Sequence, residues 1–203
     1  MFVVAKEILR SAYPSISDKA CELFIPYLNK FSDKYQLSNK AFAAFLAHLL
    51  HESGGFRYVR EIWGNTSWQN KYERDFSSAW KPNLKRTDRN YTAYNLGNNE
   101  VGDGKLFMGR GLLGITGRAN YRMCSVGVFG DDRLLKNPSL LEAAEYAVQS
   151  AFWWCFEYRR LSDEFETDSL EDDTRKINGS AMLGLDERKK FRDRILVAIG
   201  QFQ

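Results

Sequence analysis

The amino-acid sequence predicts a mainly α-helical fold with a small β or loop element in its middle third. Apolar residues recur at helical spacing in the first 53 residues and again from residue 139 to the C-terminus. Between these regions the helical periodicity weakens, and a glycine-rich stretch at residues 102–117 indicates turns around one or two short strands. The chain has 203 residues, of which 44% are hydrophobic, so it is long enough for one domain with a substantial core.

Two helices are expected at the N-terminus. The first spans residues 3–12, where apolar residues recur with helical spacing. The second is expected over residues 15–31, with Ser15 as its N-cap. Pro26 should kink or interrupt this second helix, because proline lacks a backbone donor and clashes with the preceding turn.

The third expected helix spans residues 39–53, with Ser38 as its cap, and carries the strongest candidate for catalysis. Glu52 lies at its C-terminal end, where the negative end of the helix dipole and apolar neighbours are expected to raise the pKa of the carboxyl group. Glu61 follows after a glycine turn, in a more polar segment where a carboxylate more readily stays ionised. Two carboxyl groups with unequal pKa values are what glycoside hydrolysis usually requires.

The same helix carries both histidines of the chain, His48 and His51. Their order, HxxHE, differs from the zinc motif HExxH, and the sequence has no third histidine, so we expect no metal. A structural hydrogen bond beneath the site is the expected role of His51. No GxSxG or comparable motif marks a nucleophile.

Residues 58–104 interleave aromatic side chains with asparagine, lysine and arginine. Two interpretations are open. The segment is an ordinary connection whose aromatic residues fill the core, or it lines a saccharide cleft where rings stack on sugars and amides bind hydroxyl groups. Trp63, close to Glu61 in the sequence, is the candidate for such stacking.

The last third of the chain returns to helical periodicity. A helix is expected over residues 139–160, opened by a capping box that begins at Ser139. Residues 163–173 contain seven acids and no base, which indicates a solvated, partly flexible linker. A short helix should then end at Asn178, and a final helix should begin at about Asp186.

Charge and cysteine usage limit the classes of partner. The net charge of +3 is too small to indicate nucleic-acid binding and is compatible with a polysaccharide or cell-wall substrate. Cys21, Cys124 and Cys155 are odd in number and lack CxxC spacing, which favours free thiols in a reducing compartment. No apolar run is long enough for a signal-peptide core or approaches the ~18 residues of a membrane span. These features predict storage in the cytoplasm.

Three separated motifs resemble glycoside hydrolase family 19, which comprises chitinases and the lysozyme-like endolysins of bacterial viruses. They are HESGGF at residues 51–56, the following Glu61, and GDGKLFMGRGLLGITGRANY at residues 102–121. The resemblance runs from about residue 38 to residue 188. It implies a helical, bilobed, lysozyme-like fold with a cleft between the lobes, and inverting hydrolysis without a metal or organic cofactor.

The resemblance also implies roles for individual residues. Glu52 matches the general acid, Glu61 the proposed base, and Thr116 the residue that helps to hold the attacking water. Saccharide binding is implied for four further matched positions, Asn120, Tyr121, Asn178 and Arg188. Without the resemblance, Thr116 would be interpreted as a strand residue, Asn178 as a helix C-cap and Arg188 as a surface charge. The sequence departs from the motifs that are common in the family at Gly114, at Ser180 and over residues 62–65.

We therefore expect residues 1–203 to form a single catalytic domain, with residues 1–37 as an N-terminal helical extension and residues 38–203 as its core. The expected function is that of an endolysin, which hydrolyses the β-1,4 bonds of peptidoglycan glycan strands and lyses the host cell. The alternatives are a chitinase, which cleaves β-1,4-linked N-acetylglucosamine polymers, and a non-catalytic saccharide-binding relic of the fold.

The protein is further expected to be monomeric and to bind no nucleic acid. Without an export signal, it should accumulate in the cytoplasm of the bacterial host and depend on a separate pore-forming protein for release. It would then act on the cell wall in the periplasm.

Overall fold

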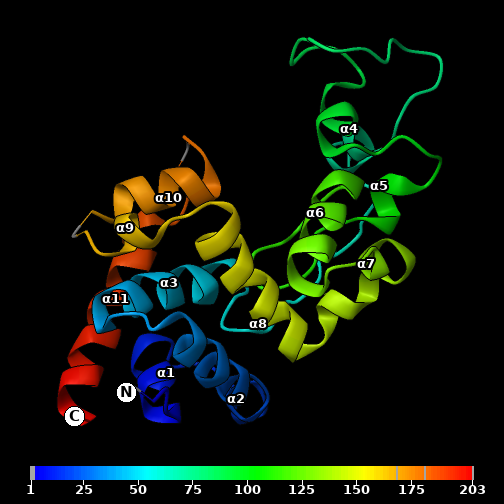
Figure 1. The fold of residues 1–203 in the computed structure, drawn as a ribbon. Coiled ribbons are helices and arrows are strands. Elements are labelled where there is room, and N and C mark those ends of the chain that lie inside the picture. The colour runs from blue at the N-terminus through cyan, green and yellow to red at the C-terminus, as the bar shows by residue number, and fades with distance from the viewer. Residues whose placement is uncertain (1–2, 168, 181, 203) are drawn as a thin grey trace. The chain divides into compact units, whose positions relative to one another are not determined.

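A computed structural model describes residues 3–167, 169–180 and 182–202, and the regular secondary structure of these residues is almost entirely helical (Figure 1). The prediction of a mainly helical fold is confirmed. The chain forms two compact units. Unit 1 combines Met1–Tyr58 with Ala151–Gln203, and unit 2 is Val59–Ser150.

Unit 1 is organised around helix α3 (Asn39–Glu52), which packs side by side with the C-terminal helix α11 (Leu185–Phe202) (Figure 1). The side chain of Ser38 accepts a hydrogen bond from the Ala41 amide at 3.0 Å, which confirms the predicted cap. All residues of α3 from Ala41 to Leu50 are buried. This helix is therefore the core of the unit, and it ends at Glu52 with an exposed carboxylate.

The two N-terminal helices differ in detail from their prediction. Helix α1 is Lys6–Ala12, and α2 is Asp18–Tyr35. The cap of α2 is Ser17, whose side chain accepts from the amide of Ala20 at 3.1 Å, rather than Ser15. Pro26 does not interrupt α2, because Pro26 and the residue one turn before it are exposed, so water can bind the carbonyl that proline leaves free.

The capping box predicted at Ser139 is wrong. Residues Pro138–Glu142 form a 3-10 helix, η2, and helix α8 begins after it, as Ala144–Phe152. A π-helical turn, η3 (Trp153–Tyr158), follows directly. The sequence pattern predicted η2 and α8 as one helix. The proline at the start of η2 and the extended backbone at Ala143 separate the two.

The prediction of a flexible linker at residues 163–173 is also wrong for the residues of this stretch that the structure describes. Helix α9 is Ser162–Phe165 and α10 is Leu170–Asn178, which ends where predicted, while Asp168 lies outside the described residues. Two of the acids pair with lysines from elsewhere in the chain, Glu164 with Lys176 and Glu171 with Lys189. Sequence composition could not show these partners, because ion pairs of this kind depend on the tertiary fold.

Unit 2 contains short helices joined by long irregular segments. In chain order these are η1 (Gln69–Tyr72), α4 (Tyr91–Leu96), α5 (Asp103–Leu106), α6 (Arg118–Phe129), α7 (Arg133–Lys136) and η2. Its small β element consists of two isolated antiparallel bridges that join Arg110 to Arg60 and to Ile115. These bridges confirm the expected short β element in the glycine-rich stretch.

All three cysteines are free and buried. Among the described residues, no helix has both the length and the apolar character that crossing a bilayer requires.

Candidate active site

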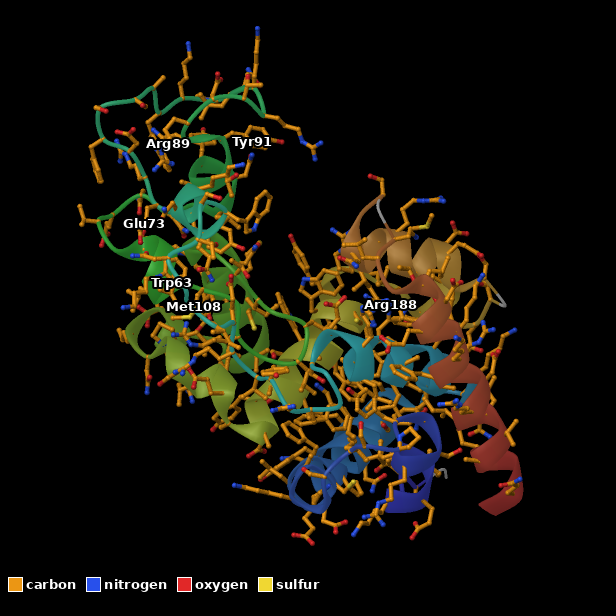
Figure 2. All side chains as sticks on the ribbon, turned by 180° about the vertical axis from the view of Figure 1, so that it is seen from behind. Trp63, Glu73, Arg89, Tyr91, Met108 and Arg188 are labelled. Carbon is orange, nitrogen blue, oxygen red and sulfur yellow. The ribbon has the colours of Figure 1, made fainter. Side chains whose placement is uncertain are left out.

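Glu52, the expected acid, ends α3 and pairs with α11. Its Oε1 accepts a hydrogen bond from Nη2 of Arg188 at 2.6 Å. The Glu52 side chain is 28% exposed, whereas that of Arg188 is fully buried. Figure 2 marks Arg188 on α11, beside α3. The surroundings of Glu52 thus include a buried cation, and not only the apolar residues that the sequence placed nearby.

His48 binds the same guanidinium one helical turn before Glu52. Its Nδ1 lies 2.8 Å from Nη1 of Arg188. Burial is the main cause that holds the pKa of His48 well below 6.5, and the nearby positive charge of Arg188 and then His51 add to it. The ring is therefore neutral and accepts at Nδ1, which places its proton on the buried and unpartnered Nε2.

The structure corrects the expectation that Arg188 binds saccharide directly. A side chain with 0% exposure cannot touch a polymer from solution. Its guanidinium instead donates to His48, to Glu52 and, at 3.5 Å, to the carbonyl of Leu183. These acceptors compensate the burial of the charge, so Arg188 positions the carboxylate of Glu52.

His51 makes a structural contact, but not beneath the site. Its Nδ1 pairs with Glu187 of α11. The ring lies against Gly184, where a Cβ atom would stand 2.0 Å from Cε1 of His51 and where φ is +76°. Only glycine fits this close approach. The role expected of His51 thus belongs to His48.

Asn178 lies next to this cluster. It is the last residue of α10, and its Nδ2 donates to the carbonyl of Leu183 at 3.1 Å. Because the same carbonyl accepts from Arg188, the structure brings Asn178 and Arg188 together around one backbone oxygen.

Glu61, the expected base, belongs to unit 2 and is held by donors on both carboxylate oxygens. Oε1 accepts from Nε2 of Gln69 at 2.9 Å, and Oε2 accepts from the amide of Gly109 at 3.2 Å. The amide of Glu61 in turn donates to the carbonyl of Gly109 at 2.8 Å. A fixed carboxylate that accepts at both oxygens is suited to bind a water proton.

Thr116 and this carboxylate both lie next to Gly109. A Cβ atom at Gly109 would stand 3.2 Å from Oγ1 of Thr116 and 3.5 Å from Oε2 of Glu61. The hydroxyl of Thr116 donates to the carbonyl of Gly114 at 2.8 Å, which leaves its lone pairs available. The structure therefore brings together the expected base and the residue expected to hold water.

Asn120 and Tyr121 follow on α6 and differ in exposure. Asn120 is half-buried, and its Nδ2 donates to the carbonyl of Thr116 at 2.7 Å. Tyr121 is fully buried, donates from its hydroxyl to the carbonyl of Met108 at 2.7 Å, and accepts from Arg110 at 3.0 Å. A buried ring offers no surface to a sugar, so the expected contact through Tyr121 is replaced by support of the backbone next to Gly109.

Trp63 lines a cavity of about 480 Å³ within unit 2. Trp63, Glu73 and Met108 lie on neighbouring segments there (Figure 2). Arg110 completes one wall, and its guanidinium binds Glu142 at 2.8 Å. A half-buried aromatic ring and a buried methionine beside fixed charges are typical of small-molecule sites.

Sequence reasoning missed His48, Gln69 and Gly109 as site residues. For His48 a signal was present, because it lies four positions before Glu52 and so on the same face of α3. The positions of Gln69 and Gly109 relative to Glu61 depend on the tertiary fold, so spacing gave no signal. Among the described residues, no group of three or more histidine, cysteine, aspartate and glutamate side chains is arranged to hold a metal ion.

Comparisons with known proteins agree with this description. No family model matches the sequence. A glycosyl hydrolase family 19 domain-containing protein of Haemophilus influenzae is 34% identical over 168 residues, which cover 76% of this chain and 78% of the relative. Chitinase C from Streptomyces griseus superposes with a TM-score of 0.63 at 17% identity, over 98% of this chain and 93% of that one. A bacterial family 19 chitinase superposes with a TM-score of 0.58 at 20% identity, over 96% and 95%. The similarity to both structures confirms the expected lysozyme-like helical fold.

Proposed function

The chain belongs to glycosyl hydrolase family 19, and on that premise we propose that this glycoside hydrolase cleaves the β-1,4 glycan strands of bacterial peptidoglycan as a lysis enzyme. Peptidoglycan and chitin share β-1,4-linked N-acetylglucosamine, so the same carboxyl chemistry serves both polymers. Peptidoglycan carries free carboxylates and chitin does not. The net charge of +3 and the pI of about 8.7 therefore favour the anionic polymer.

The observation that carries a hydrolytic mechanism is the different support of the two carboxyl groups. Oε1 of Glu52 is bound to Arg188, which leaves Oε2 to carry the proton that is transferred to the leaving oxygen. Glu61 accepts at both oxygens and takes a proton from the attacking water, which the hydroxyl of Thr116 helps to hold. In the inverting mechanism this water attacks the face of the sugar opposite the leaving group.

The remaining site residues support this chemistry in the proposal. Arg188 and His48 fix the orientation of Glu52, and Tyr121 fixes the backbone beside Gly109. Saccharide contacts are assigned to the half-buried side chains of Asn120, Asn178 and Trp63.

The substitution Glu52→Gln tests the acid. The expected result is a fall in kcat by about 10²- to 10⁴-fold, because an amide carries no transferable proton, with binding of oligosaccharide retained. Release of reducing ends from purified peptidoglycan measures the rate, and Glu61→Gln should give a comparable loss. A Glu52→Gln enzyme as active as the wild type would show that Glu52 is not the acid, and a wild type that binds glycan without cleaving it would favour the non-catalytic alternative.

The second candidate substrate is chitin, which the structural similarity to two chitinases favours. Turbidity of permeabilised Gram-negative cells, measured beside cleavage of chitin oligosaccharides, separates the two. We expect the turbidity to fall. Cleavage of chitin alone would refute the peptidoglycan assignment.

The proposal includes a cellular setting. The enzyme is stored in the host cytoplasm as a monomer and reaches the wall only after a separate pore-forming protein opens the membrane. Expression of the chain alone should therefore leave cells intact until they are permeabilised. Spontaneous lysis, or recovery of the enzyme outside intact cells, would contradict this part.

A further inference from the structure

Unit 1 contains a cavity of about 510 Å³ that the proposed mechanism does not use. It lies between the start of α2 and the loop that follows α3. Its apolar walls come from Tyr13, Ala20, Leu23, Phe24 and Phe56. Its volume is within the range of about 300–1,000 Å³ that is typical of small-molecule sites.

The polar lining of this cavity is positively charged. Lys19 and Arg57 are exposed, and neither forms an ion pair with any residue that the structure describes. No aspartate or glutamate lines the cavity, and the hydroxyls of Ser15 and Ser17 add polar oxygen atoms. Cations that form no described ion pair, in a lining that is otherwise largely apolar, are complementary to a short ligand that has both carboxylates and alkyl groups.

The cavity is connected to the site of Glu52 by direct contacts within unit 1. Its wall at Gly54 and Gly55 begins two residues after Glu52, which limits the distance between the Cα atoms of residues 52 and 54 to about 7 Å. Next to Gly55, Tyr13 packs on Phe191 of α11, with ring centroids 5.4 Å apart. Phe191 lies one helical turn after Arg188, the residue that binds Glu52.

The glycine at position 55 maintains this wall. A Cβ atom there would stand 2.7 Å from the ring of Tyr13, and φ is +68°. A larger residue would displace Tyr13 and change the cavity, so the loop after α3 both ends the catalytic helix and shapes the cavity.

We propose that this cavity binds the peptide stem of peptidoglycan, the short anionic peptide that is attached to the muramic acid residues and that chitin lacks. Lys19 and Arg57 bind its carboxylates, and the apolar walls hold its alkyl side chains. This assignment rests on the proposed function and names the part of the substrate that distinguishes peptidoglycan from chitin. The cavity is then a specificity site that binds a group outside the glycan strand.

The test compares two forms of one substrate. Purified sacculi are digested either intact or after a peptidoglycan amidase has removed the peptides, and kcat/KM is measured from reducing ends. The double variant K19A/R57A should lose about tenfold or more on intact sacculi, as expected when charge-assisted hydrogen bonds are lost, and should match the wild type on the peptide-free strands.

The matched control is R122A/K190A, which removes the same charge from two exposed cations that lie outside the cavity and form no described ion pair. It should behave as the wild type on both substrates, and circular dichroism should show that all variants are folded. Arg57→Glu should weaken cleavage of intact sacculi further.

The outcomes separate this inference from the function on which it rests. If the wild type cleaves intact and peptide-free strands equally well, or if K19A/R57A loses activity equally on both, the stem-peptide site is refuted and the peptidoglycan assignment stands. If the wild type cleaves only chitin, both are refuted.

Discussion

At the scale of single residues, Arg188 determines the surroundings of the proposed acid. The sequence placed Glu52 at a helix end, and that position is confirmed. It assigned Arg188 to saccharide or to the surface, whereas the guanidinium is buried between His48 and Glu52. His48 and Glu52 belong to α3, whereas Arg188 belongs to α11, near the other end of the chain. Only the tertiary fold brings the three side chains together. Periodicity predicts which face of a helix is buried but not which polar partner it meets.

His48 gives the residue-scale prediction. His48→Leu leaves Nη1 of the buried Arg188 without its acceptor, so the free energy of unfolding should fall by about 1–3 kcal/mol, with a lower kcat and little change in KM. His48→Gln, which keeps an acceptor, should lie between this variant and the wild type. Urea denaturation and steady-state kinetics measure both effects. A His48→Leu enzyme with wild-type stability and kcat would refute the positioning role.

The same histidine gives a pH dependence whose sign is fixed. Its pKa in the folded protein is well below 6.5, so the unfolded state binds the proton more readily. Stability contributed by neutral His48 is present above pH 6.5 and is lost as the pH falls below it. The stability advantage of the wild type over His48→Gln should therefore shrink below pH 6.5. An advantage that does not change with pH would show that His48 titrates normally.

At the scale of elements, the acidic segment around α10 shows where composition misleads. A run of acids without bases predicted a solvated linker, yet three of the described acids are ion-paired and Asp173 is 1% exposed. The helices at the N-terminal side were predictable, because caps and apolar spacing are local. The acidic helix was not, because its ion pairs with α9 and α11 depend on the tertiary fold.

Asp173 gives the element-scale prediction. Burial, followed by the nearby charges of Glu164 and Asp172, raises the pKa of Asp173 from 3.8 to about 7, and its Oδ1 has no hydrogen-bond partner. A raised pKa means that the folded state favours the neutral acid. The contribution of Asp173 to stability is therefore fully present below pH 3.8 and is lost as the pH rises through about 7.

Asp173→Asn removes this penalty. At pH 8 its Tm should exceed that of the wild type by at least about 2–4 °C, the shift that 1 kcal/mol gives in a protein of this size. The difference should disappear as the pH is lowered to about 4, near the unfolded-state pKa of 3.8. Differential scanning calorimetry across this range measures it. A variant that is less stable at pH 8 would show that the charged form of Asp173 has a partner.

At the scale of the whole molecule, unit 1 is assembled from both ends of the chain, whereas unit 2 is one continuous segment. The helical class followed from periodicity, and the small β element followed from glycine density. The resemblance implied two lobes, but the composition of unit 1 from two separate segments could not be predicted, because it depends on the packing of α3 against α11. The chain passes between the units after Tyr58 and again within α8, which ends at Phe152.

The three buried thiols allow the prediction of a single domain to be tested. Cys21 and Cys155 lie in unit 1 and Cys124 lies in unit 2. Burial raises the pKa of all three thiols, that of Cys124 to about 12, so none should react in the folded state. If the chain unfolds as one domain, alkylation in increasing urea, followed by peptide mass spectrometry, should give the same opening free energy for all three. Labelling of Cys124 at a lower urea concentration than the other two would show that the units unfold separately.

The discontinuity of unit 1 has a consequence for the timing of protein synthesis. Glu52 and Arg188 are separated by 136 positions, so at about 5–20 residues per second the ribosome adds the arginine roughly 7–27 s after the glutamate. The continuous unit 2 is complete first and can fold while the N-terminal helices still wait for α11. The nascent chain therefore holds its proposed acid without the buried cation that orients it, until α11 leaves the ribosome and supplies Arg188.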